Sequence, residues 1–520
     1  MDDRSASQPA VCHQTAPRSR AGALRFSWRS RLAYFGLGIL CAAGFAPFDF
    51  WPAAIVGLVM LVKSAGRAPS WRPVGQMGWW FGLGLGLATF PWLAHAFSFQ
   101  SAMPYWLGWA AVAALAAYTA LYWAVSLGLA HALTRSAPPA IFAIHAAALF
   151  VMAEWLRGWL LTGFPWNPLA AIWIPVPEVA QTASVIGAFG LSGLTMLVVG
   201  MAAAAARRDG LAPLFASLLG SAILVSATQT AAPLDTQVRI SLVQANIDQS
   251  EKWLPGEAER QLGRYIALTR DEDVAGPRLV FWPETAILLP LDANPALQRA
   301  AVAGLGPDDL LFTGAVGDAP DFQHTNSVFV LDAAGSILAR YDKAHLVPFG
   351  EYLPFAAVLE RFGAARLVPG AADFVAGPGP ATVELEGLKV GVAICYEVVF
   401  PASVVDSADR PAFLFNPSND AWFGWGGPEQ HLAQARLRAI EEGLPVIRAT
   451  PTGHTAVIRS DGSIAAGLPA GRAARLDTYL PTASEPTLFA VWGNAIPLGA
   501  SFMLLVAGLA VRRSTGGSKN

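Results

Sequence analysis

Three side chains of the sequence could together transfer an acyl group: a thiol, a carboxylate and an ammonium group. Cys395 ends the apolar stretch Val-Ala-Ile, Glu284 follows Phe-Trp-Pro, and Lys343 follows Tyr-Asp. A thiol nucleophile needs a base that takes the sulfur proton and donors that stabilise the oxyanion. Glu284 can supply the base, whereas Lys343 and the backbone amide after Cys395 can supply the donors. These residue types therefore indicate covalent catalysis through Cys395.

Each of these residues alone has a simpler interpretation. A glutamate after a strand commonly caps a turn, a lone lysine is commonly solvated, and a buried cysteine is commonly a small apolar core residue. The combination is more specific, because all three are predicted at strand ends, where open α/β sheets build their sites. Neither His345 nor His431 lies in a Cys/His protease signature, so histidine is not the expected base.

The elements that would position these residues are strands that alternate with helices between residues 235 and 486. Apolar and β-branched stretches bounded by Gly, Pro and Asp predict strands at 238–247, 279–282, 310–316, 327–331, 388–394 and 412–416. Amphipathic spacing predicts helices at 257–270 and 429–442. Strands buried on both faces and separated by helices indicate a layered α/β sandwich.

The rest of the chain has the composition of membrane helices. Of the 520 residues 54% are apolar and 14% are charged, and 31 of the 37 acidic residues fall between Asp235 and Glu485, so a wholly soluble or disordered chain is excluded. A bilayer core about 30 Å thick requires roughly 20 apolar residues of helix, and continuous apolar runs favour helices over a barrel. About eight spans are predicted, at 31–47, 51–63, 74–97, 105–133, 139–161, 182–206, 211–230 and 488–511.

Basic residues set the predicted orientation of these spans. They precede the first span and follow the second, fourth, sixth and eighth. Because translocation of Lys and Arg is disfavoured, these boundaries are expected in the cytoplasm, and the α/β domain then faces outward. The predicted division is a disordered cytoplasmic tail over 1–30, seven transmembrane helices over 31–230, an extracytoplasmic domain over 235–486, a final transmembrane helix over 487–511 and a cytoplasmic tail over 512–520.

Charge and cysteine content argue against several function classes. The 35 basic and 37 acidic residues nearly cancel, so no surface for nucleic acid is expected. The three cysteines lie far apart without metal-ligand spacing, so neither a zinc site nor a disulfide framework is expected. No metal or organic cofactor is implied. Glu154 and Arg157, in one predicted span, form either a structural ion pair or a functional site. A transporter would show repeated halves with broken helices, which we do not find.

Ordered motifs in the outward domain resemble the carbon-nitrogen hydrolase (nitrilase) superfamily with its Glu-Lys-Cys triad. With the surrounding spans, the chain over about 30–511 resembles the bacterial apolipoprotein N-acyltransferases, although the stretch 450–454 departs from their pattern. One such motif would be weak, whereas several in the same order are specific. The motifs are Trp282-Pro-Glu, Lys343 with His-Leu-Val-Pro-Phe-Gly-Glu-Tyr-Leu-Pro, Cys395-Tyr-Glu, Asn416-Pro-Ser-Asn-Asp-Ala-Trp-Phe-Gly424, and Gln430-His followed by Ala435-Arg-Leu-Arg-Ala439.

The resemblance implies a fold and a set of residue roles. The implied fold is a polytopic α-helical membrane protein of about eight spans with an inserted nitrilase-like αββα sandwich. Cys395 would be the nucleophile, Glu284 the general base and acid, and Lys343 the oxyanion stabiliser. The implied supporting or substrate-binding residues are Glu351, which would orient the lysine, Tyr396 and Glu397 beside the nucleophile, Trp253 on a loop over the substrate, and Trp422 and Phe423 along the acyl chain.

The resemblance also implies substrates and a location. The acyl donor would be a membrane phospholipid, and the acceptor would be the N-terminal amine of an apolipoprotein whose first cysteine carries diacylglycerol. The reaction would pass through a thioester in the bacterial cytoplasmic (inner) membrane, with the catalytic domain on the periplasmic side, and we expect a monomer. Two alternatives stay open, which are a membrane-tethered amidase or nitrilase acting on a small soluble substrate, and a transporter or lipid-binding scaffold without chemistry.

Overall fold

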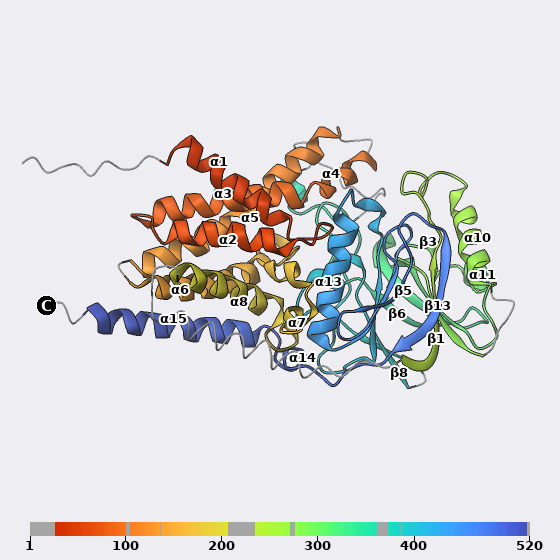
Figure 1. Ribbon diagram of the computed structural model, residues 1–520. Helices are drawn as coiled ribbons and strands as arrows, with labels where there is room; N and C mark the ends of the chain where they lie inside the picture. Colours follow the sequence, from red (N-terminus) through yellow and green to blue (C-terminus); the bar gives the residue numbers. More distant parts are fainter. Residues whose placement is uncertain are drawn as a thin grey trace, which may run out of the picture.

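The computed structural model describes residues 26–99, 104–135, 137–205, 235–270, 276–359, 361, 373–385 and 387–516. Within these ranges, a helical bundle lies beside an α/β domain (Figure 1). The predicted span at 211–230, most of the predicted N-terminal tail and the last four residues lie outside the described residues.

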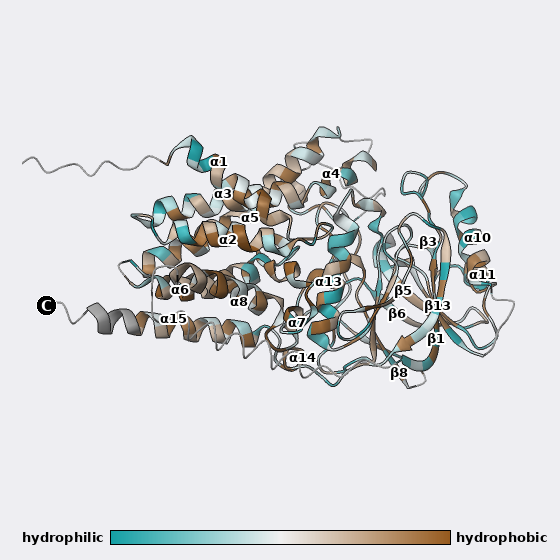
Figure 2. Ribbon diagram, in the orientation of Figure 1, coloured by the Kyte–Doolittle hydropathy of each residue, from teal (hydrophilic) through white to brown (hydrophobic). Residues whose placement is uncertain are grey.

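The bundle is built from the apolar segments that precede and follow the α/β domain in the sequence. Figure 2 shows that many residues of its helices are hydrophobic. Its described helices are α1 Trp28–Ala42, α2 Trp51–Ala65, α3 Trp71–Thr89, α4 Trp92–Ala96, η1 Phe97–Phe99, α5 Trp106–Leu133, α6 Pro139–Arg157, η2 Leu160–Thr162, η3 Leu169–Trp173, α7 Pro177–Ala180, α8 Ala183–Ala205, α14 Leu488–Trp492 and α15 Ala495–Gly516. Among the described residues, three helices are long and apolar enough to cross a membrane, namely α5, α6 and α8 over Ala183–Ala204.

Several helix boundaries differ from the predicted ones for local reasons. The predicted span 74–97 is divided into α3 and α4, because Pro91 has no amide to continue the helical ladder. The predicted span 488–511 is divided into α14 and α15 at Gly493, whose φ is 52°. Helix α1 begins inside the predicted tail, since the Ser27 side chain accepts a hydrogen bond from the Ser30 amide at 3.2 Å. Helix α15 likewise continues into the predicted C-terminal tail.

The α/β domain contains two sheets. One has seven strands, in the order β13-β1-β2-β4-β5-β6 with β3 beside β4, and the other has six, in the order β12-β11-β10-β9-β8-β7. The strands β1-β2-β4 run parallel, as do β8-β9-β10. The strands are β1 Asp235–Gln244, β2 Arg278–Phe281, β3 Ile287–Pro290, β4 Leu310–Asp318, β5 His324–Leu331, β6 Ile337–Asp342, β7 Thr382–Leu385, β8 Leu388–Val392, β9 Phe413–Pro417, β10 Val446–Ala449, β11 Ala456–Ile458, β12 Ile464–Gly467 and β13 Ala474–Pro481.

The sheets form the two central layers of a sandwich. Phe281 and Phe415 lie between them with ring centroids 4.9 Å apart, and each buried phenylalanine contributes roughly 1.5–3 kcal/mol to folding. Helices α10 and α11 cover the first sheet, and α13 covers the second. The predicted αββα sandwich is therefore present. The helices of this domain are α10 Glu257–Thr269, α11 Pro295–Ala301, η4 Pro320–Phe322, α12 Ala356–Leu359, η6 Cys395–Val399, η7 Asp420–Trp422 and α13 Gly427–Glu442.

Helix α13 is shared by the two halves of the molecule. Its residues Ala435 and Ala439 pack against the second sheet, whereas Ala433 and Leu437 belong to the core of the bundle. The helix ends at Gly443, which adopts the left-handed conformation typical of a C-terminal cap. Figure 1 shows α13 between the bundle and the sheets, so the α/β domain rests directly on the apolar helices.

Candidate active site

The predicted carboxylate, ammonium and thiol lie together at one end of the sandwich. Lys343 Nζ lies 3.2 Å from Glu284 Oε1, and the Cys395 thiol donates a hydrogen bond to the Glu284 carboxylate. Lys343 Nζ also lies 2.9 Å from Glu351 Oε1. All four side chains are buried, which strengthens the interactions between their charges.

Glu284 reaches this position because the chain turns sharply after β2. Pro283 ends the strand, and Trp282 fixes the turn from the other side by donating from Nε1 to Thr269 Oγ1 at 2.9 Å. Gly314 of β4 lies against this turn, where a Cβ atom would be 2.5 Å from the Pro283 carbonyl oxygen. A glycine is therefore required at the position that supports Glu284.

Lys343 follows β6 and lies between two carboxylates. Burial alone would lower the pKa of Lys343, but Glu284 and Glu351 raise it well above its usual value. Burial would raise the pKa of Glu284, whereas Lys343 and Asn326 lower it. Asn326 Nδ2 donates to Glu284 Oε1 at 2.8 Å and to Glu351 Oε1 at 2.7 Å, so it fixes both acids. At neutral pH the lysine is an ammonium and Glu284 is a carboxylate.

Cys395 begins the short helix η6 with a φ of 51°, in the left-handed region that a non-glycine residue rarely adopts. Burial and the neighbouring Glu284 raise the pKa of its thiol well above the usual value. The backbone N–H of Asn419 donates toward the sulfur and lowers that pKa in part. The resting thiol is therefore protonated, and its proton faces the Glu284 carboxylate.

Glu397 connects the lysine with the cysteine. Its Oε1 accepts hydrogen bonds from the backbone amides of Ala344, at 2.7 Å, and His345, at 3.0 Å. Its Oε2 accepts one from the Ile394 amide at 2.6 Å, and Tyr341 donates to the same carboxylate. The residues next to Lys343 and Cys395 thus share one buried acceptor, which fixes the distance between the two functional groups.

A second charged network lies behind the nucleophile. His431 contacts the Cys395 carbonyl oxygen through Nε2 at 3.1 Å and Asp420 Oδ1 through Nδ1 at 3.0 Å. Arg448 donates to both oxygens of Asp420 at 2.7 Å. Burial would raise the pKa of Asp420, but Arg448 lowers it to about 2. This network supports the backbone of Cys395, and sequence reasoning missed it because its members are distant along the chain.

The other predicted supporting residues are aromatic, and most of them contact the bundle. Tyr396 donates from its hydroxyl to the Gly163 carbonyl oxygen at 3.0 Å, so it points toward the bundle. Phe423 packs against Trp92, with ring centroids 4.7 Å apart, and Trp422 packs against Phe99 at 5.6 Å. Trp253 lies on the loop after β1 and is 37% exposed. Phe423 and Trp422 therefore lie where the α/β domain meets the bundle.

The Pro-bracketed segment of the bundle, residues 163–169, docks onto the α/β domain. Trp166 Nε1 and Asn167 Nδ2 each donate to Gln430 Oε1 at 2.9 Å. Glu154 accepts from the Leu169 amide at 2.9 Å and lies 3.7 Å from Arg157. These contacts favour the interpretation of Glu154 and Arg157 as a structural ion pair, because Glu154 holds the backbone of the docking segment at Leu169.

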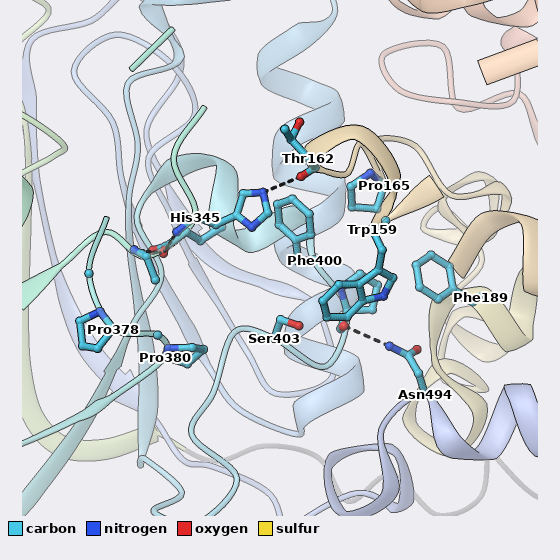
Figure 3. A pocket seen from close by; sticks show the side chains of 16 residues that line it. Trp159, Thr162, Pro165, Phe189, His345, Pro378, Pro380, Phe400, Ser403 and Asn494 are labelled. Atoms are coloured by element: carbon cyan, nitrogen blue, oxygen red, sulfur yellow. Dashed lines mark hydrogen bonds between the residues drawn. The ribbon is translucent and has the colours of Figure 1, made fainter. Parts of the chain in front are cut away.

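A separate cavity of about 380 Å³ lies between the bundle and the α/β domain (Figure 3). Trp159 and Phe189 border it on the bundle side, and His345 and Phe400 border it on the other. None of the three triad residues lines this cavity, whereas Glu397 and Ala344 beside them do, so the cavity lies next to the site. Among the described residues, no group of three or more His, Cys, Asp or Glu side chains could hold a metal ion.

Two family models match different parts of the chain. Residues 37–201 match the apolipoprotein N-acyltransferase N-terminal domain, and residues 239–474 match the carbon-nitrogen hydrolase domain. A solved CN-hydrolase superfamily protein from Xanthomonas campestris is 19% identical, with a TM-score of 0.35, and the match covers 52% of this chain and 97% of that protein.

Curated relatives match nearly the whole chain. The apolipoprotein N-acyltransferase of Rhodopseudomonas palustris is 34% identical over 93% of this chain and 96% of its own length. That of Bradyrhizobium diazoefficiens is 35% identical over 94% and 96%, respectively. The chain therefore belongs to the apolipoprotein N-acyltransferase family.

Proposed function

We propose that this protein transfers an acyl chain from a membrane phospholipid to the N-terminal amine of a diacylglyceryl apolipoprotein. The observation that carries this proposal is the buried contact of Glu284, Lys343 and Cys395 in a domain that rests on apolar helices. A thiol with a carboxylate base and an ammonium group suits acyl transfer, and both substrates are lipids that the helices can bring to the thiol.

In the first step the Cys395 sulfur attacks an ester carbonyl carbon of the phospholipid while Glu284 takes the thiol proton. Lys343 stabilises the tetrahedral oxyanion. The carbon–oxygen bond of the ester then breaks, and Glu284 returns the proton to the glycerol oxygen. A lysophospholipid leaves, and the acyl group remains on Cys395 as a thioester.

In the second step the free α-amine of the apolipoprotein attacks the thioester carbonyl carbon. Glu284 takes a proton from the amine, Lys343 again stabilises the oxyanion, and the carbon–sulfur bond breaks. The proton returns to the sulfur of Cys395, and the product is an amide. Covalent catalysis divides one difficult reaction into two easier ones, because a thioester is more readily opened by an amine than an oxygen ester is.

Further residues are proposed to support these steps. Glu351 and Asn326 orient Lys343, and Glu397 sets its distance from the thiol. Tyr396 anchors the nucleophile's helix to the bundle. Aromatic residues Trp253, Trp422 and Phe423 are proposed to border the substrate. A dry, apolar surrounding would protect the thioester from hydrolysis.

We place the protein in the bacterial inner membrane as a monomer with about eight spans and the α/β domain on the periplasmic side. The distribution of basic residues supports this orientation. A reporter fused at Asp235 should give the periplasmic signal, whereas a cytoplasmic signal would contradict the orientation. An amidase acting on a small soluble amide is less supported. Residues 37–201 match a helical domain of their own family, which is much larger than the single helix that would tether an amidase to a membrane.

The test of the function uses purified protein in detergent with a phospholipid and a synthetic diacylglyceryl-cysteine peptide. We expect a product peptide heavier by one fatty acyl group, with the amide at its N-terminus. The same peptide with an acetylated N-terminus is the control and should stay unchanged. Release of free fatty acid without peptide acylation would contradict the proposal and favour a hydrolase.

A further inference from the structure

A second lysine, Lys252, is buried beside the triad and has no role in the steps above. It lies on the loop between β1 and α10 and is only 4% exposed. Its backbone is fixed, because Gln261 Nε2 donates to the Lys252 carbonyl oxygen at 3.0 Å. Within the described ranges of the chain, its ammonium group forms no hydrogen bond or ion pair.

The loop that carries Lys252 is linked to the surroundings of Cys395. The Glu284 carboxylate raises the pKa of its ammonium group, and a thiolate at Cys395 would do the same. The loop that carries Lys252 is also tied to the nucleophile's surroundings, since Asn419 Nδ2 donates to Gln249 Oε1 at 2.9 Å and the Asn419 amide donates toward the Cys395 sulfur. Lys252 is therefore a second cation of the same site.

The carboxylates of the site do not satisfy this second cation. Lys343 already contacts both Glu284, at 3.2 Å, and Glu351, at 2.9 Å. Burial lowers the pKa of Lys252 to about 8, and Glu284 offsets only part of that effect. A buried ammonium group without a close counter-ion destabilises a protein, and an anionic ligand would remove that cost. The arrangement thus points to an anion that arrives with a substrate.

On the basis of the function proposed above, we propose that Lys252 binds the phosphate group of the phospholipid donor. The phosphate is attached to the same glycerol unit as the ester that Cys395 attacks, so it enters the site together with that ester. The acceptor, a diacylglyceryl cysteine, carries no phosphate. A lysine is a compact point charge that binds phosphate through charge-assisted hydrogen bonds. The exposed side chains of Trp253 and Leu254 on the same loop would contact apolar parts of the lipid.

The experiment compares two donors that share the same ester: dipalmitoylphosphatidylglycerol and dipalmitoylglycerol, which lacks the phosphate. The initial rate of Cys395 acylation is measured against donor concentration for the full-length protein in detergent micelles. The unsubstituted protein should prefer the phospholipid. Lys252→Met should lower the efficiency with the phospholipid roughly tenfold to a hundredfold and leave the efficiency with dipalmitoylglycerol unchanged. Lys252→Arg should keep much of the preference.

The matched control is Lys389→Met. Lys389 is a half-exposed lysine near the start of β8 that pairs with Asp409, and its replacement should change neither rate. Thermal unfolding checks that the variants fold. If Lys252→Met does not fold, the Lys252→Arg variant decides the question, because it keeps the positive charge and should keep much of the preference for the phospholipid. Equal losses with both donors, no loss with either, or no preference in the unsubstituted protein would overturn the role of Lys252. Acylation by neither donor in the unsubstituted protein would instead overturn the proposed function.

Discussion

Replacing Glu397 by glutamine tests whether one buried carboxylate holds the site together. The carboxylate accepts three backbone amides, two on the Lys343 side through Oε1 and one on the Cys395 side through Oε2. Glutamine has only one acceptor oxygen, and its amino group is a donor. Glu397→Gln therefore leaves at least one buried N–H facing another N–H.

The size of the effect follows from these contacts. A buried donor without a partner costs about 1–3 kcal/mol, and the bonds that remain lose the strengthening that a charged acceptor gives. Burial raises the pKa of Glu397, so removal of its charge returns part of this energy. We expect a net destabilisation of about 2–3 kcal/mol, which corresponds to an unfolding temperature lower by roughly 5–10 °C. The acylation rate should fall at least tenfold, since Lys343 and Cys395 lose their common support.

Two measurements check this reasoning: thermal unfolding in detergent and the single-turnover rate of Cys395 acylation by phospholipid. The matched control is Glu384→Gln, an exposed glutamate on β7, which should change neither quantity. An unfolding temperature and a rate both equal to those of the unsubstituted protein would refute the role of Glu397 as a shared acceptor.

Three further predictions concern the triad and its support. Lys343→Ala should abolish acyl-enzyme formation without preventing membrane insertion, and normal thioester accumulation would remove the lysine from the mechanism. Because burial raises the pKa of Cys395, its thiolate fraction at pH 7 is small and grows about tenfold per pH unit. Alkylation of Cys395 by iodoacetamide should therefore accelerate continuously from pH 7 to 9. A plateau of the alkylation rate below pH 8 would contradict this prediction. Gln430→Leu removes the oxygen that accepts hydrogen bonds from Trp166 and Asn167. It should lower the free energy of unfolding by about 2–4 kcal/mol, measured by thermal unfolding. An unchanged unfolding temperature would show that other contacts hold the docking segment.

Much of the α/β domain could be predicted from the sequence because its strands are continuous apolar runs between Gly, Pro and Asp. The predicted strand at 310–316 lies within β4, and the predicted helix at 257–270 matches α10 to within one residue. Seven strands escaped prediction, namely β3, β6, β7, β10, β11, β12 and β13. Strands β3 and β12 have only four residues each, and β12 is half-exposed, so its sequence lacks the apolar pattern of a core strand.

The bundle was harder to predict in detail, because hydropathy detects apolar length but not local breaks. Gly187, with a φ of 68°, interrupts α8 inside a run that reads as one continuous span. The Glu441 side chain of α13 accepts from the amide of Ala188, the first residue after this break. That acceptor lies far away in the sequence, so only the folded chain shows why the break is tolerated.

The triad could be located from motifs, whereas its supporting residues could not. Glu284, Lys343 and Cys395 stand at strand ends in recognisable contexts, and the structure brings them into contact. Asn326 and Arg448 have no local signal, because an asparagine or arginine within a strand is usually solvated. Their roles depend on burial and on distant partners, since Asp420 lies 28 residues from Arg448 and Glu284 lies 42 residues from Asn326.

The most direct test of the account is peptide mass mapping of the purified protein after incubation with phospholipid alone. The account predicts that the peptide containing Cys395 gains the mass of one fatty acyl group, that hydroxylamine removes it, and that Cys395→Ala prevents it. An unmodified Cys395 in protein that still acylates the acceptor peptide would contradict the thioester mechanism.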